Sequence, residues 1–413
     1  MIMTTFDRAN KGVPFTRDVP SGWSLFGDGA TFPAAVLLKS AVERNSASMS
    51  DYCRRHGVSL APHGKTTMSP ELFALQLRDG AWAITAANVY QARVMRDSGV
   101  ARVLIANEVT APGDIAWLAG QVQAGFDIMC YVDSLAGVHL LQEELARHLV
   151  AGRLGVLIEL GVAAGRTGAR SADEALCVAR AASASPALSV VGVAGFEGII
   201  GPADGATAQE RVDAFLVQMT QLAEMIIGEG LARDVDEFIL TAGGSVFFDT
   251  VVARLTQVRS SIPTRVVLRS GCYLSHDDGV IDELSPLGAR PRVAGDVFRA
   301  AMEVWAPVLS RPEPTRLIVG AGKRDLSTDS LLPIAKKWVQ RGTCEVRLIA
   351  APQRAVKVDD QHAYLDVDPT CDIEVGDYVG LGVSHPCTTF DKWRVVWLVD
   401  DAYDVVDVVT TRF

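Results

Sequence analysis

The stretch Val58-Ser-Leu-Ala-Pro-His-Gly-Lys65-Thr-Thr67 decides how the rest of the chain is interpreted. Its apolar start, residues 58–61, is typical of a buried β-strand, and Pro62 marks the end of that strand because proline has no N–H to donate to a sheet. Lys65 therefore follows the carboxyl end of a strand, beside His63 and after Gly64, which allows a close backbone approach. A desolvated lysine at such a place loses its proton easily and can form a Schiff base.

Two simpler interpretations compete with this one. A surface lysine in a turn is the commoner case for an isolated Gly-Lys pair. Gly64-Lys65-Thr66 also matches the end of a phosphate-binding P-loop, but that motif needs a glycine where Ser59 stands. The role of Lys65 thus depends on what else the chain brings near it.

Composition predicts an ordinary globular chain. It has 413 residues, of which 49% are hydrophobic and 21% charged, enough for a large core and two domains. The net charge of −10 argues against nucleic acid or an anionic membrane as a partner, so we expect a small-molecule ligand. We see no signal peptide and no membrane span, and we expect a cytoplasmic protein. The seven cysteines show no disulfide spacing and are expected to be mostly buried and reduced.

A regular alternation of strands and helices begins near Val58. Residues 1–33 are interpreted as an N-terminal arm and residues 34–57 as helical, and segments 70–77 and 208–229 also have helical periodicity. Between the helical segments we predict eight short strands, at residues 58–61, 82–86, 103–106, 128–132, 155–160, 190–196, 237–241 and 265–268.

Eight βα repeats predict a (β/α)8 barrel of the TIM type over residues 34–292, with a doubly wound open sheet as the alternative. The position of the unusual residues favours the barrel, since they follow the strands and would share one face. Glycine-rich loops follow the seventh and eighth strands, where barrels bind phosphates. Their backbone N–H groups would contact phosphate oxygens, with Ser245 beginning the next helix. These loops are Gly243-Gly244-Ser245 and Ser270-Gly271-Cys272-Tyr273.

Past residue 293 the pattern predicts a β-rich C-terminal domain that extends to residue 413. Its short apolar segments are residues 316–319, 345–350, 363–367, 378–383 and 394–399. Within it, His385-Pro-Cys387 would place an imidazole and a thiolate on the same side of an extended segment, a pair that suits zinc. Most His-x-Cys sequences bind nothing, and two ligands leave coordination incomplete.

Taken together, these motifs resemble the D-serine dehydratase and D-threonine aldolase family of pyridoxal-phosphate enzymes with the alanine-racemase fold. The residues that carry the resemblance are 62–67, Gly165-Arg166-Thr-Gly168, the two glycine-rich loops and residues 384–393. The resemblance implies a barrel with a C-terminal β-rich domain, and a homodimer.

The resemblance also assigns roles to residues. Lys65 matches the Schiff-base lysine, with His63 beside it, and Arg166 matches the arginine that contacts the cofactor ring. The phosphate-binding positions are Gly243, Gly244, Ser245, Gly271 and Tyr273. His385 and Cys387 match the metal ligands of the dehydratase branch, whereas the aldolase branch tends to carry an aspartate in place of Cys387.

Three residues need separate comment. Phe196 stands where aldolase-like members often have tyrosine, and its ring has no hydroxyl to donate. Glu197 is expected to hold an arginine, with an acid or base role as the alternative. His362 is interpreted either as a structural residue or as one that contacts the site residues without contacting the substrate.

The function expected from this resemblance is the metal-dependent dehydration of a D-3-hydroxy amino acid to a 2-oxo acid and ammonia, with pyridoxal 5′-phosphate and Zn²⁺ as cofactors. A retro-aldolase would use the same groups to give glycine and an aldehyde. A racemase would need a second base that we do not identify. A pyridoxal-phosphate carrier without turnover has no use for a Lewis acid.

Overall fold

The computed structural model describes residues 10–13, 23–27, 31–148, 151–203, 205–232 and 235–413. Much of the predicted N-terminal arm, namely residues 1–9, 14–22 and 28–30, lies outside these ranges. The chain forms two compact units. We call residues 50–65 and 73–271 the barrel unit, and residues 1–49, 66–72 and 272–413 the β-rich unit.

The barrel unit is built on a parallel sheet of eight strands in the order β3-β10-β9-β8-β7-β6-β5-β4. The strands are β3 (Ser59–Leu60), β4 (Ile84–Ala86), β5 (Arg102–Glu108), β6 (Asp127–Val132), β7 (Leu154–Leu160), β8 (Leu188–Gly195), β9 (Phe238–Ala242) and β10 (Thr264–Leu268). All eight predicted strands are thus present.

The first and last strands of this order are joined by the residues that follow β3. His63 forms a parallel bridge with Thr85 of β4. Trp82 N donates to Leu60 O at 2.7 Å, and Thr85 N donates to Pro62 O at 2.9 Å. The sheet therefore closes into a barrel, and the open doubly wound alternative is wrong.

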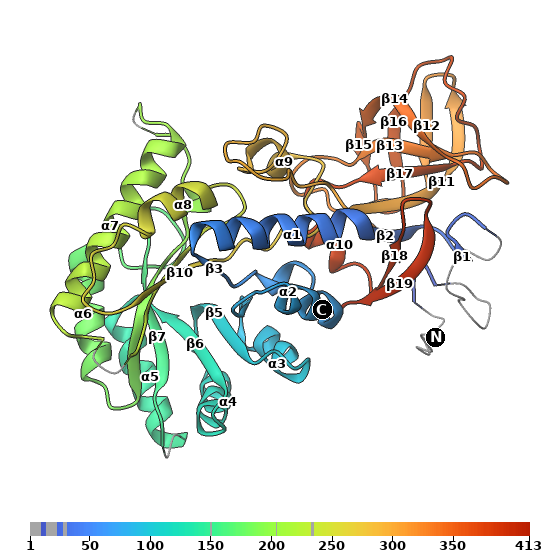
Figure 1. Cartoon of the computed structure of the whole chain (residues 1–413). Helices are drawn as coiled ribbons and strands as arrows, with labels where there is room; N and C mark the ends of the chain where they lie inside the picture. Colours follow the sequence, from blue (N-terminus) through green and yellow to red (C-terminus); the bar gives the residue numbers. More distant parts are fainter. Residues whose placement is uncertain (1–9, 14–22, 28–30, 149–150, 204, 233–234) are drawn as a thin grey trace. The chain divides into compact units, whose positions relative to one another are not determined.

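Helices cover the outside of this sheet, as Figure 1 shows for α3 to α8. The helices are α2 (Pro70–Arg78), α3 (Val89–Asp97), α4 (Pro112–Gln123), α5 (Leu135–His148), α6 (Ala172–Ala184), α7 (Ala208–Gly228) and α8 (Phe248–Leu255), preceded by α1 (Lys39–His56). Their starts follow from local sequence, because side chains of Asn88, Ser171 and Thr207 cap α3, α6 and α7. Among helices of the described residues, none combines the length and apolar character that crossing a membrane requires.

The barrel interior is filled by side chains from the strands and the residues beside them. They are Ala61, Ala83, Leu104, Met129, Tyr131, Leu157, Ala194, Ile239 and Val267. The barrel is therefore a packed core, and chemistry is left to the loops at its ends.

The β-rich unit contains an eleven-stranded sheet whose main path runs β1-β19-β18-β2-β11-β12-β16-β15. Its strands are β1 (Trp23–Ser24), β2 (Ala34–Leu38), β11 (Met302–Glu313), β12 (Arg316–Val319), β13 (Ile334–Val339), β14 (Val346–Arg354), β15 (Lys357–Val358), β16 (Ala363–Asp366), β17 (Tyr378–Gly382), β18 (Val395–Val399) and β19 (Asp404–Thr410). Two short helices, α9 (Val280–Leu284) and α10 (Cys387–Phe390), complete it.

Residues 34–38 were predicted to be helical, and this is wrong. They form β2, which pairs antiparallel with β11 and parallel with β18. Periodicity cannot separate a short apolar run in a strand from one in a helix, so only the pairing decides. Because β2 joins the sheet of the β-rich unit, the compact units divide the chain at places other than the predicted boundaries after residues 33 and 292.

The close approach of β8 and β9 yields a stability prediction. A Cβ at Gly192 would lie 2.2 Å from the carbonyl oxygen of Ile239. We expect Gly192→Ala to lower the free energy of unfolding by about 1–3 kcal/mol, because two paired strands must separate to make room. Urea denaturation measures this.

The matched control is Gly120→Ala in α4, where an added Cβ meets nothing within 4 Å. This change should be neutral or stabilise the protein by up to about 1 kcal/mol, since alanine favours a helix interior. Equal stability of the Gly192→Ala protein and the wild type would contradict the strand-contact argument.

Candidate active site

Lys65 lies in the short 3-10 helix η1 (Gly64–Thr66), directly after β3 and Pro62, as the sequence predicts. A Cβ at Gly64 would lie 2.5–2.9 Å from side-chain atoms of Met95, Ile84 and Phe73, so only glycine fits there. The Lys65 side chain is exposed. In the part of the chain that the structure describes, it forms no ion pair.

His63 lies beside Lys65 with its ring partly buried. Its Nδ1 is shielded from solvent and has no hydrogen-bond partner. Burial holds the pKa of His63 well below its usual value, and the positive charges of Lys65 and two arginines, Arg269 and Arg166, lower it further. The imidazole is therefore neutral near pH 7.

Arg166 lies in the loop after β7 with its guanidinium carbon 4.6 Å from the centroid of the Phe196 ring. The phenyl ring that departs from the family pattern thus supports Arg166 by a cation–π contact. Gly168 has a φ of +97° and donates its N–H to Asp133 Oδ2 at 3.0 Å. These contacts hold the loop on the carboxyl side of the strands.

Glu197 was expected to hold an arginine, and the structure gives it a different partner. Its buried carboxylate accepts hydrogen bonds from the backbone N–H of Gly243 at 3.1 Å and of Gly244 at 2.6 Å. Gly243 has a φ of +92°, which glycine adopts without strain. The loop after β9 therefore directs two backbone N–H groups at the carboxyl oxygens of Glu197.

Side chains of the two residues that directly follow β10 form hydrogen bonds to the ends of neighbouring strands and to the loop after β9. The Ser270 hydroxyl donates to Gly243 O at 3.1 Å and to Gly244 O at 2.9 Å. Arg269, which sequence reasoning missed, is buried and donates to Thr241 Oγ1 at 2.7 Å and to Gly195 O at 2.6 Å. Its guanidinium therefore links the ends of β8, β9 and β10.

The other predicted phosphate-binding residues lie as follows. Ser245 is in a turn three residues before α8 begins, so the prediction that it starts that helix is wrong. Gly271 is buried just after β10. Tyr273, in the β-rich unit, is buried with its ring 6.2 Å from that of Phe298. Their contact with phosphate stays a prediction.

Three carboxylates that sequence reasoning missed gather where β5, β6 and β7 end. Glu108, Asp133 and Glu159 each place an oxygen within 4.8 Å of the others. Burial raises the pKa of Glu108 to about 8, and the charges of Glu159 and Asp133 add to the effect. Polar residues at strand ends were the signal available, the same signal that singled out Lys65.

The metal-ligand pair lies in the β-rich unit. Cys387 begins α10, and Pro386 before it has helical dihedrals, so the predicted extended His-x-Cys segment is wrong. His385 Nδ1 lies 2.7 Å from Asp329 Oδ2, and Thr388 donates its hydroxyl to the other oxygen of Asp329 at 2.9 Å. Asp329 therefore orients the imidazole through Nδ1, as a carboxylate commonly does for a metal-binding histidine.

Cys387 has a second thiol beside it. Its Sγ lies 3.2 Å from Cys272 Sγ and 3.3 Å from Thr66 Oγ1. The Cys272 hydrogen bond and the His385 ring hold the pKa of Cys387 well below its usual value. The interaction with Cys387 raises the pKa of His385 to about 9. These neighbours favour the thiolate form of Cys387, which is the form that binds metals.

The cysteines were expected to be reduced and mostly buried, and the structure agrees with this in part. All seven are free, but only Cys53 and Cys130 are buried. The other predicted supporting residue, His362, is exposed between β15 and β16, and its carbonyl accepts a hydrogen bond from Asp359 N at 2.8 Å.

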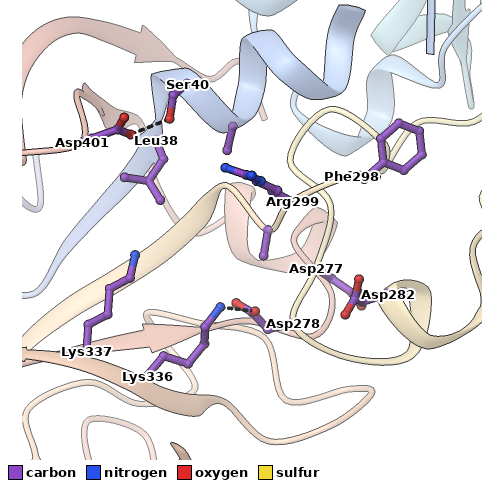
Figure 2. A pocket seen from close by; sticks show the side chains of 12 residues that line it. Leu38, Ser40, Asp277, Asp278, Asp282, Phe298, Arg299, Lys336, Lys337 and Asp401 are labelled. Carbon is purple, nitrogen blue, oxygen red and sulfur yellow. Dashed lines mark hydrogen bonds and ion pairs between the residues drawn. The ribbon is translucent and has the colours of Figure 1, made fainter. Parts of the chain in front are cut away.

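Figure 2 shows a pocket of about 390 Å³ in the β-rich unit. Two pairs of its lining side chains interact: Lys336 lies 2.5 Å from Asp278, and Ser40 donates to Asp401 at 2.5 Å. None of the predicted site residues lines it. We therefore place the chemistry on the strand-end and His385–Cys387 residues.

Comparison with known proteins places two segments of the chain in known families. Residues 39–231 match the alanine racemase N-terminal domain, and residues 301–399 match the "Putative serine dehydratase domain". D-threonine aldolase from Filomicrobium marinum shares the fold, with a TM-score of 0.75 and 24% identity over 95% of this chain and 98% of that one.

Relatives at the sequence level include both aldolases and a dehydratase. The chain is 27% identical to 3-hydroxy-D-aspartate aldolase of Paracoccus denitrificans over 88% of this chain and 92% of the relative. It is 31% identical to D-threo-3-hydroxyaspartate dehydratase of Delftia sp. over 26% of this chain and 28% of the relative. Two solved structures of that dehydratase are similar to this chain, each with a TM-score of 0.71 and 18% identity over 94% of this chain. The matched regions cover 99% and 96% of those two chains. One is a cysteine-to-alanine mutant in the metal-free form, and the other is a histidine-to-alanine mutant at a position two residues before that cysteine.

The carboxylate cluster predicts how stability depends on pH. Below about pH 4.5, Glu108 is protonated in both folded and unfolded chains; between 4.5 and about 8, only the folded chain keeps the proton. Stability is therefore lost as pH rises through this window. Glu108→Gln should remove the loss and gain about 1–2 kcal/mol at pH 8, after discounting for partial exposure.

Urea denaturation at pH 5 and pH 8 measures the effect. The control is Glu143→Gln on the exposed side of α5, which should leave the pH dependence unchanged. If Glu108→Gln loses as much stability as wild type between the two pH values, the proton is not held at this cluster.

Proposed function

The chain belongs to the family that joins an alanine racemase-type barrel to a serine dehydratase-type domain, and we propose that it is a pyridoxal 5′-phosphate enzyme that removes water from a D-3-hydroxy amino acid. The products would be a 2-oxo acid and ammonia. The observation that carries the proposal is the His385–Cys387 pair with Asp329 behind the imidazole.

The barrel residues fit the phosphorylated cofactor. Lys65 has an exposed amine, and Arg166 and Arg269 add positive charge around His63. The N–H groups of Gly243 and Gly244 bind a carboxylate in this structure, which supports anion binding at that loop. Pyridoxal phosphate, when bound, supplies an electron sink for the substrate α-carbon.

Each barrel residue would then have a distinct task. Lys65 would hold the cofactor covalently and later take the α-proton as general base. The neutral ring of His63 is suited to packing beside a flat aromatic ring without adding charge. Arg166, supported on Phe196, would donate to the cofactor ring, and Ser245, Gly271 and Tyr273 would help to hold the phosphate.

The metal residues fit a soft divalent ion. Imidazole and thiolate ligands favour zinc over manganese or magnesium, and a carboxylate on the other ring nitrogen is the usual support of a metal-bound histidine. Such an ion, when bound, supplies a Lewis acid for the β-hydroxyl, which is a poor leaving group without charge neutralisation. The His-x-Cys spacing also matches the two mutated positions of the Delftia dehydratase structures.

Aldol cleavage is the second candidate, because relatives that match most of the chain carry aldolase names. It would use the same lysine, cofactor and metal to break the Cα–Cβ bond. The presence of Cys387, where the aldolase branch tends to have aspartate, favours dehydration. We also infer from the family resemblance that the protein acts as a homodimer in the cytoplasm.

The first prediction of this proposal concerns Lys65. Purified protein should show a visible cofactor absorption band, and borohydride reduction should fix the label on Lys65, as peptide mapping by mass spectrometry will show. Lys65→Arg should abolish the label, whereas Lys357→Arg on the exposed edge of the β-rich unit should keep it. Label on a different lysine would refute the assignment.

The second prediction separates dehydration from aldol cleavage. With D-serine, D-threonine and D-3-hydroxyaspartate we expect 2-oxo acid and ammonia, and no turnover of the L-isomers. Chelation should abolish the release of both products, and zinc should restore it. Cys387→Ala should reduce the rate by about 100-fold or more while keeping the cofactor band, because it removes a metal ligand only.

Cys371→Ala, a half-buried thiol of the same unit, serves as control and should keep full activity. Glycine and an aldehyde as the main products from D-threonine would establish the aldolase instead. Undiminished turnover after chelation would exclude the metal from the reaction.

A further inference from the structure

We propose that Cys272 is a third protein ligand of the metal ion that His385 and Cys387 hold. This inference rests on the proposed function for the presence of the ion. It adds a residue from the loop after β10 to a pair that the sequence places on another segment of the β-rich unit.

The position of the two sulfur atoms carries the inference. Cys272 Sγ lies 3.2 Å from Cys387 Sγ, although 115 residues separate them in the chain. Two thiolates on one tetrahedral zinc ion, with Zn–S bonds of about 2.3 Å, are about 3.8 Å apart. A disulfide would need about 2.05 Å. The observed Sγ–Sγ distance is therefore closer to that of two thiolates on one zinc ion than to the length of a disulfide bond.

The surroundings of Cys272 differ from those of a core-filling cysteine. Cys53 and Cys130 are buried, whereas Cys272 is half-buried. Two polar groups approach its sulfur: Cys387 Sγ and, at 4.0 Å, Thr66 Oγ1. A thiol kept only for packing has no need of a second thiol and a hydroxyl around it.

Thr66 extends the arrangement around the sulfurs. Its Oγ1 lies 3.3 Å from Cys387 Sγ and accepts a hydrogen bond from that sulfur. Hydrogen bonds of this kind orient metal ligands and tune their basicity.

Coordination chemistry explains why a third ligand is needed. Catalytic zinc is typically held by three protein ligands, for example two cysteines and one histidine, with the fourth position open to water or substrate. His385 and Cys387 alone fall one ligand short. In the described residues the three ligand atoms are not all within 4.8 Å of one another, so shared coordination would require one of these side chains to shift.

The test is metal binding by the reduced, full-length protein. Zinc affinity is measured in competition with a chromophoric chelator, and Co²⁺ is substituted to count thiolates from sulfur-to-cobalt charge-transfer absorption. Cys272→Ser should weaken zinc binding by at least about tenfold and remove about half of that absorption, and Cys387→Ser should do the same. Cys371→Ser, a half-buried thiol of the same unit, should change neither quantity.

Circular dichroism and the cofactor band verify that each variant folds, and Cys272→Ala replaces Cys272→Ser if the latter does not. Unchanged zinc affinity and cobalt spectrum in the Cys272 variant, with loss in Cys387→Ser, would overturn this inference and leave the proposed function standing. If wild-type protein binds neither ion, the metal part of the proposed function fails as well.

A redox pair is the competing explanation for two adjacent thiols. Mass spectrometry of peptides from protein kept in air, with and without zinc, distinguishes the two. Protection of Cys272 and Cys387 from oxidation by zinc supports shared coordination. A Cys272–Cys387 disulfide that forms equally with zinc present would overturn the inference.

Discussion

The parallel bridge between His63 and Thr85 is the contact on which the barrel unit depends. The hydrogen bonds around it join the two ends of the eight-stranded sheet. Closure makes all strand ends of one direction share a single rim. Because the bridge lies one residue before Gly64, the backbone that closes the barrel also sets the position of Lys65. Gly64 fits this place because any side chain would meet Met95, Ile84 and Phe73.

Charge on that rim is arranged in two groups of opposite sign. Burial lowers the pKa of His63, and the charges of Lys65, Arg269 and Arg166 lower it further. Burial raises the pKa of Glu108, and the charges of Glu159 and Asp133 add to the effect. Glu197 stands apart from both, since its carboxylate is satisfied by backbone N–H groups. Shifted pKa values of neighbouring groups are common at sites that move protons.

The β-rich unit contributes a different chemistry. Asp329 holds one nitrogen of the His385 ring, and the same ring interacts with Cys387. The short helix α10 brings Cys387 toward Thr66 and Cys272. A soft ion suits these ligands, and the electron sink of the proposed cofactor and the Lewis acid then have separate protein supports.

The sequence by itself determined the eight strands, the strand-end lysine, the glycine-rich loops and the His-x-Cys pair. Those features are local, since apolar runs, prolines and glycines act on the backbone within a few residues. Only the tertiary structure decided that residues 34–38 form a strand, because β2 exists through pairing with β11 and β18. It also decided the partner of Glu197, the carboxylate cluster and the meeting of Cys272 with Cys387. Each of these depends on side chains from distant segments, and a contact across 115 residues leaves no periodic trace in the chain.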